Sequence, residues 1–287
     1  MIIHHGKKQR MNSTVINTKI GEIEYCSVGQ GIPIVFIHGG HSNCFDTLSH
    51  KGFDLSKFQL ITPSRPGYGK TPLNGHRTPK QTAELIAELL NCLPIKPAIV
   101  YGISAGGLTA IELAAQHPDK VQKLILASAI SKKWLAKDNK IYKTAQIIFN
   151  PKTEGVTWGM VSLFSKLLPR IIANSFYPQF STFSKHQLKH EDIQELISAL
   201  KHYRSKSGFL NDVDQDICET SLEKIECPSL IIHSKYDNSV SIEHAINAKE
   251  KIHNSQFVEL DNKWGHLFWI GKASEQAVMK TIEFINE

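Results

Sequence analysis

A serine between small residues is the first place where this sequence could carry out covalent chemistry. Residues 102–106 read Gly-Ile-Ser-Ala-Gly and match the pattern G-x-S-x-G, with Ser104 at its centre. A chain with 18 glycines contains such a match by chance in roughly one case in ten, so the pattern needs support from its surroundings. A β-rich run, 98–101, ends directly before it, and an Ala- and Leu-rich helical run, 105–117, follows. Small residues on both sides of the serine let strand and helix approach closely, so we predict that Ser104 is a nucleophile on a strained strand–helix turn.

A serine hydroxyl becomes a good nucleophile when a histidine accepts its proton and a carboxylate orients that histidine. Among 14 histidines, His266 stands out because Gly265 precedes it, in a loop between a predicted strand, 256–260, and the last predicted helix. Such a loop lies at the carboxyl edge of a parallel sheet, where the sites of α/β proteins form. We predict that His266 is the base; the alternative is a histidine that only packs between Trp264 and Phe268.

Three aspartates compete for the role of the orienting carboxylate. Asp237 follows the apolar run 229–233 and begins a turn, which places it at the same predicted sheet edge. Asp261 is too close to His266 in sequence, and Asp216 lies at the end of a segment of different character. We therefore predict Asp237, although an Asp-Asn pair is also a common turn former.

An acyl-transfer site also needs N–H groups that stabilise negative charge on a carbonyl oxygen. Ala105, directly after the predicted nucleophile, can supply one at the start of its helix. The motif His38-Gly39-Gly40-His41 follows the apolar run 33–37, and glycines let the backbone come close to a ligand. We predict Gly40 N–H as the second donor and His41 as a nearby substrate contact; the alternative is an ordinary Gly-Gly turn.

The elements that must position these residues alternate between β-rich and helical runs, which is typical of a mostly parallel sheet with helices on both faces. An opening antiparallel hairpin is expected over 14–18 and 22–28. Further strands and helices are predicted by apolar runs and by leucines and alanines at helical spacing. The predicted strands are 33–37, 59–62, 98–101, 123–127, 229–233 and 256–260, and the predicted helices are 78–93, 105–117, 243–252 and 274–285.

One segment, 131–216, breaks this alternation. Strand-like runs are absent from it, its apolar residues suggest helices and irregular turns, and a helix is expected over 191–204. We predict a core built from 1–130 and 217–287 and a helical cap, 131–216, that roofs the site. Trp158 of the cap, together with His41 and Trp264, is a tentative lining of the substrate pocket.

The predicted cap carries most of the net charge. It holds 13 Lys and Arg against 8 Asp and Glu, which is +5 of the +6 of the whole chain. One hypothesis is that this charge steers anionic substrates toward the site. The more ordinary interpretation is a solvated, lysine-rich surface.

The order Ser104, Asp237, His266, with the HGG motif upstream, resembles the α/β-hydrolase superfamily across nearly the whole chain. In that family a helical cap is inserted between the nucleophile and the acid, which matches 131–216. Residues 64–69, Ser-Arg-Pro-Gly-Tyr-Gly, are similar to the D-x-P-G-Y-G turn after the family's fourth strand, with Ser64 in place of the aspartate. This departure puts a structural hydrogen bond of the turn in question, and we interpret 65–69 mainly as scaffold.

What the resemblance implies is a serine hydrolase that acts on a small ester or related acyl compound and uses no metal or organic cofactor. Dehalogenases and epoxide hydrolases of this fold need a carboxylate at position 104, where this chain has a serine. Proline iminopeptidases usually show HGGPG, whereas residues 38–42 of this chain read HGGHS. Carboxylesterases, thioesterases, lactonases and carbon–carbon bond hydrolases remain open. A small-molecule sensor with an intact triad is the alternative from another class, because fold alone does not fix function.

The charge, the apolar stretches and the cysteines of the sequence limit the kinds of partner and the compartment that we expect. The net charge of +6 is spread without a dense Lys/Arg run, which disfavours nucleic-acid binding, and no apolar stretch is long enough to span a membrane. The N-terminus turns basic where a signal peptide would be apolar, and the five scattered cysteines suit reduced thiols, so a cytoplasmic protein is expected. No pattern in the sequence sets an oligomeric state.

Overall fold

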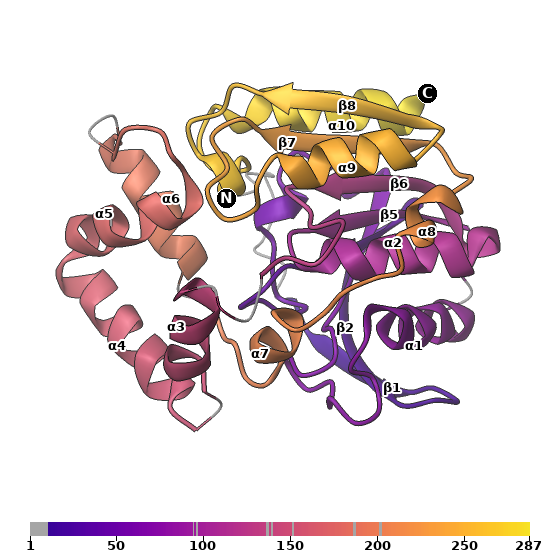
Figure 1. Cartoon of the computed structure of the whole chain (residues 1–287), viewed down its shortest axis with the longest axis horizontal. Coiled ribbons are helices and arrows are strands. Elements are labelled where there is room, and N and C mark those ends of the chain that lie inside the picture. Colours follow the sequence, from indigo (N-terminus) through magenta and orange to yellow (C-terminus); the bar gives the residue numbers. More distant parts are fainter. Residues whose placement is uncertain are drawn as a thin grey trace.

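The computed structural model describes residues 11–287 except 94, 96, 136, 137, 139, 151, 186, 187, 201 and 202. Its centre is an eight-stranded sheet in the order β1-β2-β4-β3-β5-β6-β7-β8 (Figure 1). The opening hairpin β1–β2 and the pair β2–β4 are antiparallel, and the other pairs are parallel. The strands are β1 (Ser13–Asn17), β2 (Glu22–Gly29), β3 (Ile32–Ile37), β4 (Phe58–Pro63), β5 (Ala98–Ile103), β6 (Val121–Ala127), β7 (Ser229–Ser234) and β8 (Ser255–Leu260).

Apolar runs form the central strands because both faces of the sheet are covered. Every residue of β5 is buried, and β3 places alternate side chains in two separate hydrophobic clusters. Val35 and Ile37 pack on one face and Ile34 and Phe36 on the other, as the alternation of side chains along a strand requires. A run without polar alternation therefore predicted a doubly covered strand correctly.

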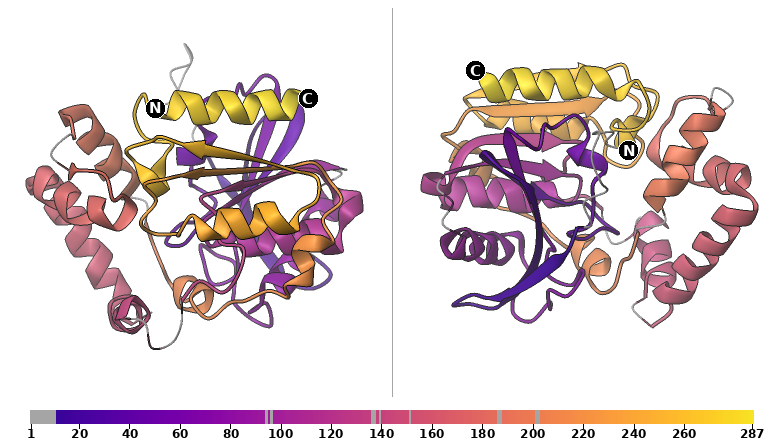
Figure 2. Two further views of the ribbon diagram at one scale, coloured as in Figure 1. Left: turned by 45° about the horizontal axis from the view of Figure 1, so that its top comes forward. Right: turned by 180° about the vertical axis from the view of Figure 1, so that it is seen from behind.

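Helices cover the two faces unequally. The helices α1 (Pro79–Cys92), α2 (Gly106–Gln116) and α9 (Glu243–Lys251) contribute to the first cluster, and α10 (Ser274–Asn286) contributes to the second. Figure 2 shows α10 and α9 on opposite sides of the sheet. The four helices lie close to their predicted ranges. The first begins where Thr78 accepts a hydrogen bond from Gln81 N–H in a capping box, with Pro79 in the first turn.

Between β6 and β7 the chain leaves the sheet and forms helices, as predicted for this part of the sequence. These are α3 (Lys140–Ile148), α4 (Glu154–Leu167), α5 (Pro169–Phe180), α6 (His190–Leu200) and α7 (Gly208–Asp212), followed by the short α8 (Thr220–Glu223). The helices α3 to α6 stand apart from the sheet, and α7 lies between them and the strands (Figure 1). The helix predicted over 191–204 ends at Leu200, and 201 and 202 lie outside the described residues. We call α3 to α7 the cap; its predicted boundaries at 131 and 216 stay a prediction.

The turn after β4 keeps a hydrogen bond although it lacks the expected aspartate. Ser64 Oγ accepts the backbone N–H of Cys44 at 3.0 Å and donates to the buried carboxylate of Glu24 at 3.0 Å. The serine hydroxyl thus connects the turn to the loop that follows β3. The substitution in this motif does not leave the turn without a side-chain hydrogen bond.

Candidate active site

Ser104 lies at the turn between β5 and α2 with a left-handed backbone conformation, φ +50°. This conformation is costly for a residue with a side chain and persists only where its surroundings fix it. The N–H of Ser104 donates to Ala127 O at 3.2 Å, and its carbonyl accepts from Gly107 N at 2.9 Å and from Ile130 N at 3.0 Å. Three backbone hydrogen bonds therefore hold the predicted nucleophile in its strained turn.

The two glycines of the motif are required by close packing. A Cβ atom on Gly102 would lie 2.5 Å from the Cβ of Ala110, and one on Gly106 would lie 2.2 Å from the carbonyl oxygen of Ile37. Both distances are too short for any side chain. The structure thus gives the physical reason for the small residues on which the sequence argument depended.

The structure brings His266 and Asp237 to Ser104 from two other loops. His266 lies in a single helical turn, Gly265–Leu267, after β8, and its Nε2 is 3.0 Å from Ser104 Oγ. Its Nδ1 is 2.9 Å from Asp237 Oδ2 and 3.2 Å from Oδ1. Gly265 has φ +55°, and a Cβ there would lie 2.3 Å from Phe180 O, so the histidine enters its turn over a position that only glycine can occupy. A hydroxyl, an imidazole and a carboxylate therefore form a continuous chain of contacts.

The competing aspartates are not part of this arrangement. Asp261 pairs with Lys235 at 3.0 Å, and its side chain is 70% exposed. Asp216 is exposed near the end of the segment between β6 and β7. Of the three aspartates, Asp237 is the one whose carboxylate contacts His266.

The side chain of Asp237 is completely buried, and its carboxylate is ionised. Burial alone would raise the pKa of its carboxyl, but His266, His233 and the Val240 N–H together bring this pKa below its ordinary value. Oδ1 accepts the backbone N–H groups of Ser239 and Val240, each at 2.9 Å. A carboxylate satisfied in this way has a fixed orientation toward the imidazole.

His233 is a neighbour of the acid that the sequence argument missed. Its Nε2 lies 2.9 Å from Val240 O and 3.3 Å from Asp237 Oδ2. Burial is the main reason why the pKa of His233 is lowered, so the ring is neutral near pH 7. The signal that could have found it is a histidine four residues before the aspartate, on the same strand end.

Ala105 and the loop that carries Gly40 lie beside the predicted nucleophile. A Cβ on Gly39 would be 2.9 Å from the Cβ of Ser104, so the loop after β3 passes directly next to the serine. Ala105 occupies the position before the first turn of α2. Within the part of the chain that the structure describes, neither Gly40 N–H nor Ala105 N–H donates to a protein acceptor. Their role as oxyanion donors stays a prediction.

Two of the three tentative pocket residues are brought together. Ser205 Oγ lies 2.7 Å from His41 Nδ1 and 2.9 Å from Trp158 Nε1. Ser205 Oγ accepts the indole N–H of Trp158 and lies within hydrogen-bonding distance of His41 Nδ1, and burial lowers the pKa of His41 to about 3. His41 is thus a neutral ring that touches the aromatic side chains of Phe149, Trp158, Tyr203 and Phe209 from the cap region.

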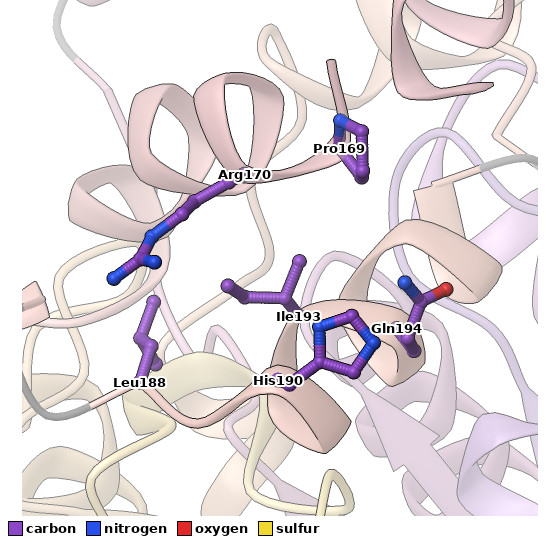
Figure 3. A pocket seen from close by; sticks show the side chains of 6 residues that line it. All are labelled: Pro169, Arg170, Leu188, His190, Ile193 and Gln194. Carbon is purple, nitrogen blue, oxygen red and sulfur yellow. The ribbon is translucent and has the colours of Figure 1, made fainter. Parts of the chain in front are cut away.

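Trp264 does not join this group. It is completely buried, packs edge-to-face against Tyr177 with ring centroids 5.5 Å apart, and belongs to a cluster formed with α5 and α6. A separate hollow of about 230 Å³ also lies between α5 and α6 (Figure 3). None of the predicted site residues lines it; its walls are Pro169, Arg170, Leu188, His190, Ile193 and Gln194.

Metal sites and membrane spans are two other features that the structure bears on. Among the described residues, no group of three or more His, Cys, Asp or Glu side chains is placed to hold a metal ion. In the same part of the chain, no helix combines the length and the apolar character that crossing a bilayer demands.

Comparison with known proteins decides the family. Residues 32–273 match the family described as the alpha/beta hydrolase fold. The chain belongs to the α/β-hydrolase family. This α/β-hydrolase is 36% identical to the uncharacterized hydrolase YcgS of Bacillus subtilis, over 89% of this chain and 92% of that protein. The predicted fold, a mostly parallel sheet covered by helices, is thereby confirmed.

Two further relatives of this α/β-hydrolase have informative names or structures. It is 30% identical to the pimeloyl-[acyl-carrier protein] methyl ester esterase of Chromobacterium violaceum, over 74% of this chain and 78% of that enzyme. It is also similar to a solved alpha/beta hydrolase fold protein of Nakamurella multipartita, with a TM-score of 0.78, 27% identity and coverage of 95% of this chain and 98% of the other. The chain is a hydrolase of this fold with esterase-like relatives.

Proposed function

We propose that this α/β-hydrolase is a serine hydrolase that cleaves a small ester or a related acyl substrate through Ser104, His266 and Asp237. The observation that carries the proposal is the continuous chain of contacts from Ser104 Oγ to His266 Nε2 at 3.0 Å and from His266 Nδ1 to Asp237 Oδ2 at 2.9 Å. A serine hydroxyl in such a chain can be deprotonated as it attacks.

In the first half of the reaction, Ser104 Oγ forms a bond to the carbonyl carbon, and its proton passes to His266 Nε2. The π electrons of the carbonyl move onto its oxygen, which accepts hydrogen bonds from Gly40 N–H and Ala105 N–H. The tetrahedral species then expels the alcohol, which takes the proton from His266, and an acyl-enzyme remains. The buried, ionised Asp237 stabilises the imidazolium in between.

In the second half, water attacks the acyl-enzyme while His266 Nε2 accepts a proton from it. Collapse of this second tetrahedral species breaks the bond to Ser104 Oγ, and His266 returns the proton to the serine. The products are a carboxylic acid and the free enzyme. One imidazole thus accepts and returns the proton in each half of the reaction, and neither half needs a redox partner.

Support for an ester substrate comes from a relative. The similar enzyme of Chromobacterium violaceum is named as a methyl ester esterase, and it is alike over most of both chains. The neutral His41 and the aromatic side chains around it favour an apolar acyl group in the part of the site under the cap. The free cysteines favour a reducing, cytoplasmic compartment.

The test is turnover of p-nitrophenyl acetate and butyrate by the full chain and by Ser104→Ala. We expect multiple turnover by the wild-type protein and a loss of kcat by about 10⁴ or more in the variant, because the nucleophile is removed. The fold of the variant is checked by circular dichroism and thermal unfolding. Full activity in Ser104→Ala would exclude this function, and labelling of Ser104 without turnover would favour a sensor.

A further inference from the structure

Arg65, which the sequence argument treated as scaffold, is a buried cation with partners in two separate regions. On one side its Nη1 and Nη2 donate to Asp212 Oδ1 and Oδ2 at 2.6 and 2.7 Å, a bidentate pair in which both side chains are 2% exposed. Tyr68 OH also donates to Asp212 Oδ2, at 2.6 Å. Asp212 is the last residue of α7, so this side of the guanidinium belongs to the cap.

On the other side, the same guanidinium holds the backbone of the HGG loop. Arg65 Nε donates to His38 O at 2.7 Å, and Nη2 donates to Gly39 O at 3.0 Å. His38 assists: its Nε2 accepts the backbone N–H of Arg65 at 3.0 Å, so its Nδ1 carries the proton and donates to Gly39 O at 2.8 Å. Gly39 O therefore accepts two hydrogen bonds, one of them from a charged donor.

We call these hydrogen bonds of Arg65 and His38 the clamp. The geometry of one peptide unit connects the clamp to the candidate reaction. The carbonyl of Gly39 and the N–H of Gly40 belong to the same planar, trans peptide and point in opposite directions. Fixing the carbonyl oxygen toward Arg65 and His38 therefore aims Gly40 N–H away from them. Two consecutive glycines have little conformational preference of their own, so without the clamp this peptide could rotate. A charged donor on the carbonyl also polarises the peptide and strengthens its N–H as a donor.

The cap side of the clamp is itself firmly docked. Gly208, at the start of α7, donates its N–H to Gly67 O at 3.1 Å, and a Cβ on Gly208 would lie 2.2 Å from the ring of Tyr68. The helix thus rests directly on the turn that carries Arg65, with α7 between the helices α3 to α6 and the strands (Figure 1). The position of Asp212 depends on this docking.

We propose that Arg65 and Asp212 are positioning residues for the oxyanion donor Gly40 N–H, so that docking of α7 completes the oxyanion hole. Asp212 orients and neutralises the guanidinium, the guanidinium fixes Gly39 O, and the peptide plane transmits that orientation to Gly40 N–H. The inference rests on the proposed function, since it assigns a role in the same reaction. It makes the cap a part of the machinery that stabilises the transition state, in addition to a cover over the substrate.

A purely structural ion pair predicts different kinetics. If Arg65 and Asp212 only stabilised the fold, the folded fraction of a variant would react normally, because a buried pair contributes to folding without touching the reaction. If they aim an oxyanion donor, the folded variant loses kcat while KM changes little, because the interaction is made only in the transition state.

The sharpest variant is Arg65→Lys. Lysine keeps the positive charge near Asp212, but a single ammonium cannot reach Asp212, His38 O and Gly39 O in the fixed geometry of the guanidinium fork. We expect kcat for p-nitrophenyl butyrate to fall about 10- to 100-fold with KM within about threefold, which is somewhat less than the loss of a whole oxyanion donor. Asp212→Asn should behave in the same way, and the double variant should lose little more than either single one.

A transition-state analogue gives a second readout that a structural role would not move. A trifluoromethyl ketone forms a hemiketal with Ser104 whose oxygen occupies the oxyanion hole, so its inhibition constant should rise in proportion to the loss of kcat/KM. The matched control is Glu112→Gln, a buried carboxylate on α2 that accepts from Ser221 Oγ at 2.6 Å away from the HGG loop. It should lower thermal stability and leave kcat and the inhibition constant within about twofold.

The outcomes separate the two claims. A wild-type chain without turnover and without labelling at Ser104 would overturn the proposed function. A wild-type chain that turns over, with Arg65→Lys and Asp212→Asn folded and equal to it in kcat, would overturn this inference alone. Should Asp212→Asn fail to fold, Arg65→Lys and Tyr68→Phe, which removes one donor to Asp212 and no charge, decide the question by the same two readouts.

Discussion

The sheet and the cap differ in how completely their apolar residues are buried. Every residue of β5 is buried, whereas the cap exposes a row of large apolar side chains along α4 and α5, with Leu163 at 55% and Leu167 at 65% exposure. The central strand is therefore covered on both faces, while α4 and α5 leave apolar side chains exposed to solvent. The proposed reacting groups Ser104, Asp237 and His266 thus follow strands of the doubly covered sheet, whereas Trp158, the predicted pocket residue of the cap, lies on the partly exposed α4.

The largest effect should follow from changing the acid on the sheet side. Asp237→Asn removes the charge that orients His266 and stabilises its imidazolium, while the shape of the side chain is kept. We expect kcat for p-nitrophenyl esters to fall by about 10³ to 10⁴ with little change in KM. A variant within tenfold of wild type would mean that the carboxylate does not support the base.

This prediction depends on the part of the site that the sequence described best. Ser104, Asp237 and His266 each follow a strand whose apolar run is unambiguous, and parallel strands deliver their carboxyl ends to one edge of the sheet. Local pattern and sheet topology are therefore sufficient to predict that Ser104 and His266, which are 162 positions apart, lie close together.

What the sequence could not predict depends on side-chain contacts between elements that no period connects. Arg65 and Asp212 are 147 positions apart, and neither lies in a pattern that points to the other. Trp264, two positions before His266, is a tentative pocket residue in the sequence, but it packs against α5 and α6. The turn at Gly265, with φ +55°, sends the two side chains to different neighbours, and a sequence does not show which side of a turn faces the substrate.

A second effect is expected in the pH dependence of the stability of the sheet region. His50 is buried beside Phe36 and Thr62, and burial lowers its pKa from 6.5 to about 4. The unfolded chain therefore binds a proton below pH 6.5 that the folded protein does not bind, so the stability contribution is complete above pH 6.5 and is lost as pH falls toward 4. We expect wild-type protein to lose on the order of 2 kcal/mol through this group between pH 7 and pH 5.

The measurement is urea unfolding at pH 7 and pH 5 for wild type and His50→Gln. The glutamine variant, although less stable at pH 7, should show a shallower decline toward pH 5. His190→Gln is the matched control, because this side chain at the start of α6 is exposed and should leave the pH dependence unchanged. An equally steep decline in His50→Gln would show that the folded protein does not hold this ring neutral.

A smaller effect is expected on the cap side of the site. Trp158→Phe removes the indole donor to Ser205 and leaves the hydroxyl free to rotate away from His41. We expect the ratio of kcat/KM for p-nitrophenyl butyrate to that for acetate to change by about threefold to tenfold, since a pocket discriminates a methylene group by about 1 to 3 kcal/mol. Turnover of the acetate should persist. A variant with an unchanged ratio would place the acyl group elsewhere.

The smallest effect should come from the exposed apolar row of the cap. Leu163→Ser removes a side chain that is 55% exposed, so we expect a change in unfolding free energy within about 0.5 kcal/mol. Leu196→Ala, a completely buried residue of α6, is the comparison and should cost about 2 to 5 kcal/mol. Equal losses in the two variants would mean that Leu163 is covered in solution.

The nucleophilic role of Ser104 is tested by intact-mass analysis after treatment with a fluorophosphonate, followed by mapping of the modified peptide. We predict one adduct per chain, on Ser104, and no adduct in Ser104→Ala. Labelling of His266→Ala should be slower by about a hundredfold or more, because the base is missing. An adduct on a different residue, or equal labelling rates with and without His266, would contradict this prediction.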